Sequence, residues 1–362
     1  MPVTCKQIAE MVGVSRPAAA SVLNHAKVCR VSPEKREKIL KLAEELHYVS
    51  SNVARTLVRG RSDTIGILTG GLHVYRVNQN LITLDGALRE AGFLPVIVYT
   101  RSEYEAIAAG IRSLVRQGVD AVLILGAGPS VMGPLCKNRL HQIIPTVFLD
   151  LDWIPDNEQI NYVNFDYAPA CDEMARYFRN RSVRRVHTFF YDSTRPSITP
   201  CQKELMRLKN EHALSFTASW NIHRMDVLHP EKTVLSLYED VYAELRAMKE
   251  PPDLLIFENT PCALASLPIL LERGWKIPDR VQVFSFSPNQ AQESCLPVST
   301  IHPDFRAFSI AVTRTLEKVI RQPESTPIVE KVPALFIPGE KKTAEPAAGC
   351  SISGKKHVKA IS

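Results

Sequence analysis

The chain has 362 residues, which is too long for one compact core and predicts about two or three structural units. Hydrophobic residues make up 45% and charged residues 23%, as in ordinary globular proteins, and no apolar run reaches the roughly 18 residues that cross a bilayer. The N-terminus lacks the layout of a signal peptide, so we expect a cytoplasmic protein without a membrane partner. The eight cysteines form no C-x-x-C pair and do not cluster with histidine, which disfavours a zinc site or a disulfide framework.

The positive charge is concentrated at the two ends of the chain. Residues 1–60 carry ten Lys/Arg and five Asp/Glu, and residues 339–362 carry five Lys and two Glu. Because the formal net charge of the chain is +6, the residues between these ends carry −2. A basic N-terminal segment on a slightly acidic body indicates that this end meets a polyanion, although a merely solvated surface gives the same pattern.

The first sixty residues predict short helices in close succession. Thr4 begins a capping box with the glutamine three residues later, and Gly13 ends the helix that follows. Ser15 is a good N-cap for a second helix, and Ser32 followed by Pro33 is a good start for a third. A helix, a glycine turn and a second capped helix within about twenty residues predict a helix-turn-helix, whose second helix can enter the major groove of DNA.

After residue 63 the pattern changes to buried strands that alternate with helices. Strands are expected at 64–68, 94–99, 121–125, 145–150, 186–190, 254–257 and 281–286. Helices are expected at 81–91, 103–117, 167–181, 202–212, 232–248 and 261–273. This alternation predicts an α/β core of two lobes, each built on its own doubly wound parallel sheet.

Three successive stretches resemble the LacI/GalR family of repressors. They are VTCKQIAEMVGVSRPAAASVLN (3–24), VSPEKREKILKLAEELHYVSSNVARTLVRG (31–60) and SDTIGIL (62–68), and further matches in the same order reach about residue 338. The resemblance implies an all-α helix-turn-helix head, a hinge helix and a two-lobed core like that of periplasmic sugar-binding proteins. The last segment is polar and rich in small residues, so we expect a disordered tail. The corresponding ranges are 1–49, 50–60, 61–338 and 339–362.

The resemblance also implies which residues contact DNA. They lie in the first helix cap, the recognition helix, the aromatic position after the third helix, and the hinge: Thr4, Ser15, Arg16, Pro17, Ala18, Ser21, Asn24, Tyr48, Ser51, Ala54, Arg55 and Leu57. Leu57 matches the leucine that enters the minor groove when the hinge helix folds on its operator. Taken singly, Asn24 is also a helix terminator, Tyr48 a packing residue and Leu57 part of an ordinary linker.

The recognition helix departs from the family pattern. The family commonly has a serine-arginine pair near the end of this helix, where this chain has Ala20 and Ser21. Arg16 is therefore the only long polar side chain in the helix. We expect it to bind guanine through O6 and N7, and the competing hypothesis is that it contacts only phosphate.

The core departs further from its sugar-binding relatives. Where they have an Asn-Asp pair this chain has Asn259-Thr260, and Ser287 replaces an aspartate that follows a later strand. Gln202 is the nearest equivalent of a common arginine, whereas Asp150 is retained. The residues expected to bind an effector are Asp150, Asn164, Gln202, Asn259, Thr260 and Ser287. With fewer carboxylates in this set, a sugar is only one candidate effector.

We therefore expect a homodimeric, sequence-specific regulator, most simply a repressor, whose operator affinity is controlled by a small molecule between the lobes. The alternative is the same DNA-binding role without an effector, or under the control of a partner protein. An enzyme is disfavoured because the sequence has no phosphate-binding loop, zinc-protease motif or nucleophile elbow, and we assign no catalytic residue, metal or cofactor. A solute-binding protein shares the core architecture but has no helix-turn-helix.

Overall fold

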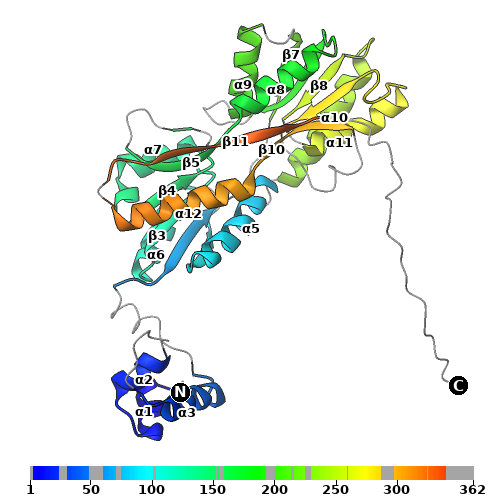
Figure 1. The fold of residues 1–362 in the computed structure, drawn as a ribbon. Coiled ribbons are helices and arrows are strands. Elements are labelled where there is room, and N and C mark those ends of the chain that lie inside the picture. Colours follow the sequence, from blue (N-terminus) through cyan, green and yellow to red (C-terminus); the bar gives the residue numbers. More distant parts are fainter. Residues whose placement is uncertain are drawn as a thin grey trace, which may run out of the picture.

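The computed structural model describes most of the chain (Figure 1). The described residues are 3–23, 31–48, 60–70, 75–100, 103–151, 153–154, 159–192, 200–212, 216–224, 230–258, 260–286, 297–323 and 325–339.

Three helices form the N-terminal head: α1 (Cys5–Val12), α2 (Arg16–Leu23) and α3 (Pro33–Glu45). The predicted capping box is confirmed, because Thr4 Oγ1 accepts the Gln7 N–H and the Gln7 side chain accepts the Thr4 N–H. Gly13 ends α1 with φ +69°, a left-handed conformation that glycine adopts without steric cost. The turn between α1 and α2 is therefore sharp.

The head has a small apolar core of its own. Ile8, Ala9, Ala19, Val22 and Ile39 are buried together, and they come from all three helices. Alanine at position 19 leaves room for close approach of α2 to its neighbours, because its side chain is a single methyl group. This core is distinct from the three apolar clusters of the α/β core.

The first lobe of the core is built on five parallel strands. They are β1 (Thr64–Thr69), β2 (Leu94–Tyr99), β3 (Ala121–Leu125), β4 (Thr146–Leu149) and β5 (Asn161–Asp166). Its helices are α5 (Tyr75–Glu90), α6 (Tyr104–Arg116) and α7 (Pro129–Lys137), followed by the short 3-10 helix η1 (Leu140–Gln142). Alternate strand residues enter different apolar clusters, as Ile67 and Leu68 do, so both faces of this sheet are covered.

The second lobe repeats the plan. Its strands are β6 (Val186–Asp192), β7 (Phe216–Arg224), β8 (Leu254–Phe257), β9 (Gln282–Ser285) and β10 (Val298–Pro303). Its helices are α8 (Ala168–Arg179), α9 (Pro200–Asn210), α10 (Pro230–Ala247) and α11 (Thr260–Glu272). The chain then returns to the first lobe, where α12 (Phe305–Arg321) lies beside α5 (Figure 1).

The two lobes are joined by β11 (Val329–Ile337), which runs across both of them (Figure 1). This strand pairs in parallel with β5 and antiparallel with β10, so the strand order is continuous: β2-β1-β3-β4-β5-β11-β10-β9-β8-β6-β7. The expectation of two separate, wholly parallel sheets is corrected at this junction. The reason is that the last strand returns from α12 and can reach β10 only in the opposite direction.

Candidate DNA-binding surface and candidate effector site

The N-terminus of α2 is the most exposed part of the predicted recognition helix. Ser15 caps the helix, since its Oγ accepts the Ala18 N–H at 3.3 Å. Ser15, Arg16 and Pro17 are exposed, whereas Ala18 and Ser21 are half-buried. The free N–H groups and the positive end of the helix dipole lie at this end, which suits an approach to phosphate. Arg16 therefore occupies the outermost turn of a helix that the head core holds in place.

Thr4 and Tyr48 flank this surface in the chain but have structural roles of their own. The Thr4 hydroxyl is engaged with Gln7 in the capping box. Tyr48 packs against the head core, and its hydroxyl lies near the Cys5 thiol, so each group shifts the pKa of the other. Burial raises the pKa of Tyr48, and the neighbouring Cys5 adds to the shift, so the phenol keeps its proton at neutral pH.

Several predicted site residues lie outside the described residues. They are Asn24, Ser51, Ala54, Arg55 and Leu57 of the proposed DNA contacts, together with Asn259 and Ser287 of the proposed effector site.

The core immediately after the predicted hinge is well anchored, because the Asp120 carboxylate accepts the backbone N–H groups of Ser62 and Asp63, each at 2.8 Å.

Asp150 is the centre of a buried polar cluster at the carboxyl end of β4. It has φ +54°, in the left-handed region that aspartate tolerates better than most residues. Its Oδ1 accepts a hydrogen bond from Arg76 Nη1 at 2.9 Å, and its Oδ2 accepts one from Asn80 Nδ2 at 3.4 Å. Arg76 also donates to the Tyr167 hydroxyl at 3.2 Å. The side chain of Asp150 is 5% exposed and that of Arg76 is 25% exposed, so the guanidinium is the accessible side of the pair.

Asn164 lies next to this cluster but is bonded to the backbone. Its Oδ1 accepts the Leu151 N–H at 2.8 Å and its Nδ2 donates to the Leu151 carbonyl at 3.0 Å. The structure thus brings Asn164 close to Asp150, with Asn164 holding the segment that follows Asp150. This arrangement indicates a positioning role for Asn164.

Two other predicted effector residues lie in the second lobe. Thr260, the first residue of α11, is buried and shares a hydrogen bond of 3.0 Å with the Ser285 hydroxyl. Gln202 is half-buried on α9. Both follow carboxyl ends of parallel strands in the second lobe, the edge where open α/β sheets bind ligands.

Sequence reasoning missed Arg76, Asn80 and Tyr167. The helix that carries Arg76 and Asn80 was expected to begin at residue 81, but α5 begins at Tyr75. Its first turns are polar, so they do not show the apolar periodicity on which the prediction relied. The tyrosine directly after β5 was a usable signal, since residues at carboxyl ends of parallel strands face the ligand-binding edge.

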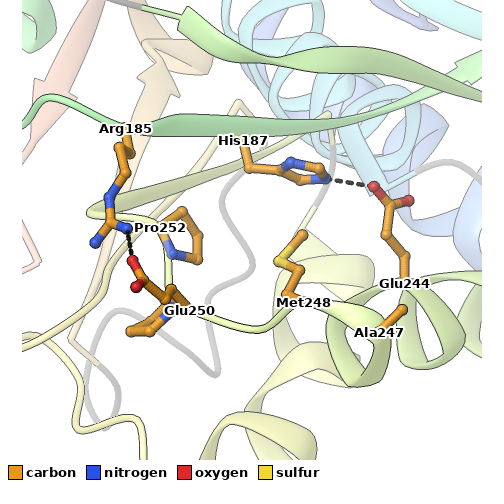
Figure 2. Close-up of a pocket in the computed structure, with 8 residues that line it drawn as sticks. Arg185, His187, Glu244, Ala247, Met248, Glu250 and Pro252 are labelled. Atoms are coloured by element: carbon orange, nitrogen blue, oxygen red, sulfur yellow. Dashed lines mark hydrogen bonds and ion pairs between the residues drawn. The ribbon is translucent and has the colours of Figure 1, made fainter.

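A separate cavity of about 340 Å³ lies in the second lobe (Figure 2). It is lined by Arg185, His187, Glu244, Ala247, Met248, Glu250, Pro251 and Pro252. His187 Nε2 lies 2.6 Å from Glu244 Oε1, and Arg185 pairs with Glu250 at 2.6 Å. Arg185 and His187 are at the amino end of β6, so this cavity is at the opposite edge of the sheet from Thr260 and was not predicted.

Within the described ranges, no group of three or more His, Cys, Asp or Glu residues could hold a metal ion. Over those same ranges, no helix is long and apolar enough to cross a membrane.

Comparisons with known proteins agree with this architecture. Residues 175–340 match the periplasmic binding protein-like domain. The chain is 21% identical to the HTH-type transcriptional repressor PurR of Pasteurella multocida (strain Pm70), over 92% of this chain and 97% of that protein. It is 24% identical to the sucrose operon repressor of Klebsiella pneumoniae, over 92% of this chain and 96% of that protein.

A solved structure of the lac repressor dimer, bound to operator and the anti-inducer ONPF, has the same fold with a TM-score of 0.75. That match has 19% identity and covers 93% of this chain and 98% of that one. These comparisons support the resemblance to the LacI/GalR family. The two-lobed core of this chain has the fold of that solved structure, and the similarity to these proteins extends over nearly their whole length.

Proposed function

We propose that the protein is a homodimeric transcriptional repressor that binds an operator through residues 1–49. The observation that carries this proposal is the exposed N-terminus of α2, where Ser15, Arg16 and Pro17 stand out from a packed three-helix head. The relatives named above are repressors, and one is described in complex with operator and an anti-inducer. Lys and Arg side chains of the basic head supply affinity for phosphate, and Arg16 reads a base edge.

Residues 50–60 form the hinge in this proposal, and Leu57 enters the minor groove between two base pairs. An inserted leucine unstacks and kinks the duplex, so the centre of the operator should favour flexible pyrimidine–purine steps. Ser51, Ala54 and Arg55 lie beside it in the hinge, and Asn24 contacts phosphate at the end of the recognition helix.

A second copy of this chain covers an exposed apolar surface on the first lobe. Val96 and Val98 of the edge strand β2 pack on the α6 side of the sheet. Ile97 and Tyr99 therefore point to the α5 side, where they are 47% and 51% exposed, and Ile82 of α5 is 65% exposed. Apolar side chains gathered at a sheet edge favour association over solvent contact. A two-fold dimer presents two heads to a pseudo-palindromic operator.

The effector site proposed between the lobes includes the cluster around Asp150. The oxygen atoms Thr69 Oγ1 and Asn80 Oδ1 are buried, and no described residue hydrogen-bonds them. A buried polar atom without a partner costs about 1–3 kcal/mol, so a bound polar molecule with hydroxyl or amine groups is favourable there. A ligand that contacts both lobes changes operator affinity only if it binds one arrangement of the lobes more tightly than the other. One of these arrangements binds the operator and the other does not.

The competing function is a repressor that needs no effector. It is favoured by the Arg76–Asp150 pair, because the carboxylate that would hold an effector hydroxyl already accepts a bond from the chain itself. A thermal-shift screen of sugars, nucleosides and acidic metabolites distinguishes the two. A ligand that stabilises the wild-type protein supports the effector, and a screen without any shift supports the effector-free function.

The DNA-binding function is tested by selecting binding sites for the full-length protein from a random DNA library. We expect an inverted repeat, and an affinity that falls steeply with salt at about −0.9 per phosphate contact on a log–log plot. No enriched sequence, or binding that does not change with salt, would contradict the proposal.

A further inference from the structure

The Cys5 thiol connects three parts of the head. Cys5 is the first residue of α1, and its Sγ lies 3.8 Å from the backbone carbonyl oxygen of Arg16 at the start of α2. The thiol also lies near the hydroxyl of Tyr48, which follows α3, and both side chains pack against the head core. One half-buried side chain therefore contacts the base-reading residue of the proposed function and a second proposed DNA contact.

A thiol at this junction can donate one hydrogen bond and accept another. Burial raises the pKa of the Cys5 thiol, an effect only partly offset by the Arg16 charge and the nearby Tyr48 hydroxyl. Cys5 is therefore a neutral thiol at pH 7 and can donate to the Arg16 carbonyl while its sulfur accepts the Tyr48 O–H. Serine retains both capacities, whereas alanine has neither.

The partners of Cys5 are themselves held in place. The capping box fixes Thr4, directly before Cys5. The backbone N–H of Tyr48 donates to the Ala43 carbonyl at 2.8 Å, which ties Tyr48 to the end of α3. The thiol thus links the first turn of α2 to two anchored positions. Loss of this link removes one restraint on the backbone of Arg16, at the point from which its side chain reaches the groove in the proposed function.

We propose that Cys5 is a positioning residue for Arg16 and sets how strictly the protein distinguishes bases. The inference rests on the proposed function, because it requires Arg16 to read a base. Bidentate recognition needs a geometry held to about 0.5 Å, so a small displacement of Arg16 lowers discrimination more than it lowers phosphate-driven affinity.

The test is a double-mutant cycle in the full-length protein. Discrimination is the ratio of affinities for the selected operator and for the same operator changed at the base pair that Arg16 reads. Cys5→Ala should lower this ratio by about fivefold, and Cys5→Ser should keep it within about twofold of wild type. Cys5→Ala combined with Arg16→Ala should give the ratio of Arg16→Ala alone. Met11→Ala, a change at an exposed apolar residue of the same helix, should leave the ratio unchanged.

Affinity for unrelated DNA reports whether each variant head is folded, since that binding depends on phosphate contacts alone. An unchanged affinity ratio in Cys5→Ala would overturn the inference. It would also be overturned if the double variant lowered the ratio by the product of the two single effects. If Cys5→Ala fails to fold, equal discrimination by Tyr48→Phe and wild type would overturn it instead. A wild-type protein without any base preference would contradict the proposed function as well, whereas the other outcomes leave that function standing.

Discussion

Arg76 reaches from the first turn of α5 to Asp150 after β4, with Nη1 of the guanidinium 2.9 Å from Oδ1 of the carboxylate. The same nitrogen donates to the Tyr167 hydroxyl, directly before α8 of the second lobe. Burial, above all, raises the pKa of Tyr167, so this hydroxyl stays protonated. A side chain of the first lobe thus links Asp150 to the start of the second.

Arg76→Ala should lower the free energy of unfolding by about 3 kcal/mol, because it leaves the Asp150 carboxylate buried without its cation. The double variant Arg76→Ala, Asp150→Asn should recover much of this loss, since no buried charge is then uncompensated. Chemical denaturation of both proteins measures the difference. If the double variant loses as much free energy of unfolding as Arg76→Ala does, Arg76 does not stabilise the fold by compensating the Asp150 charge.

Asp253 should make the second lobe sensitive to acid. Burial alone would raise its pKa, but hydrogen bonds from the backbone N–H groups of Arg184 and Arg185, with help from the nearby arginine side chains, lower the pKa below its ordinary value. A lowered folded-state pKa stabilises the fold above the unfolded-state pKa and loses this effect as the pH falls through the folded-state value.

We therefore expect Asp253→Asn to be less stable than wild type above about pH 5, with the difference shrinking below about pH 4. Denaturation midpoints across pH measure this, and Glu239→Gln, at an exposed carboxylate on α10, is the control. A difference that persists unchanged at low pH would contradict the role of the carboxylate charge.

The exposed apolar surface on β2 and α5 should hold the dimer together. Ile97→Glu combined with Ile82→Glu should shift the protein toward monomer and weaken operator binding, because charged side chains in an interface core must lose their hydration. Leu271→Glu on α11 is the control, since Leu271 is 73% exposed in the other lobe. Analytical ultracentrifugation measures the oligomeric state of both variants. An intact dimer in the Ile82/Ile97 variant would show that the interface lies elsewhere.

The head should unfold independently of the core. Ile39→Ala removes a fully buried side chain from the head core and should destabilise the head by about 2–4 kcal/mol. Hydrogen exchange should then increase in α1–α3 while β1 and β3 keep their protection. Equal loss of protection in both parts would show that residues 1–49 do not form a separate domain.

The strands were predictable where they are short, continuous apolar runs, as at 121–125 and 254–257. Other strands were missed because polar residues interrupt their apolar pattern: β5 contains Asn161, Asn164 and Asp166, and β7 contains Asn221 and Arg224. The prediction also placed no element at β10, α12 or β11, so it could not anticipate the antiparallel junction. That junction depends on long-range pairing, which local periodicity does not encode.

The caps of the head were predictable because they are local: Thr4, Gly13 and Ser15 act on backbone groups a few residues away. The contacts that define the polar clusters are not local. Arg76 meets Asp150 across 74 residues of chain, and Cys5 meets Arg16 across a turn that brings two helices together. Residue types at these positions carry the chemistry, but only the fold shows which of them meet.

The most direct measurement is the affinity of the full-length protein for its selected operator and for operators with single base-pair changes, with wild type compared to Arg16→Ala. Arg16 binding to guanine predicts that the variant loses about 1–3 kcal/mol on the selected site and loses its preference at one base pair in each half-site. Uniformly weaker binding to every operator, with the pattern of preferences unchanged, would contradict base reading by Arg16.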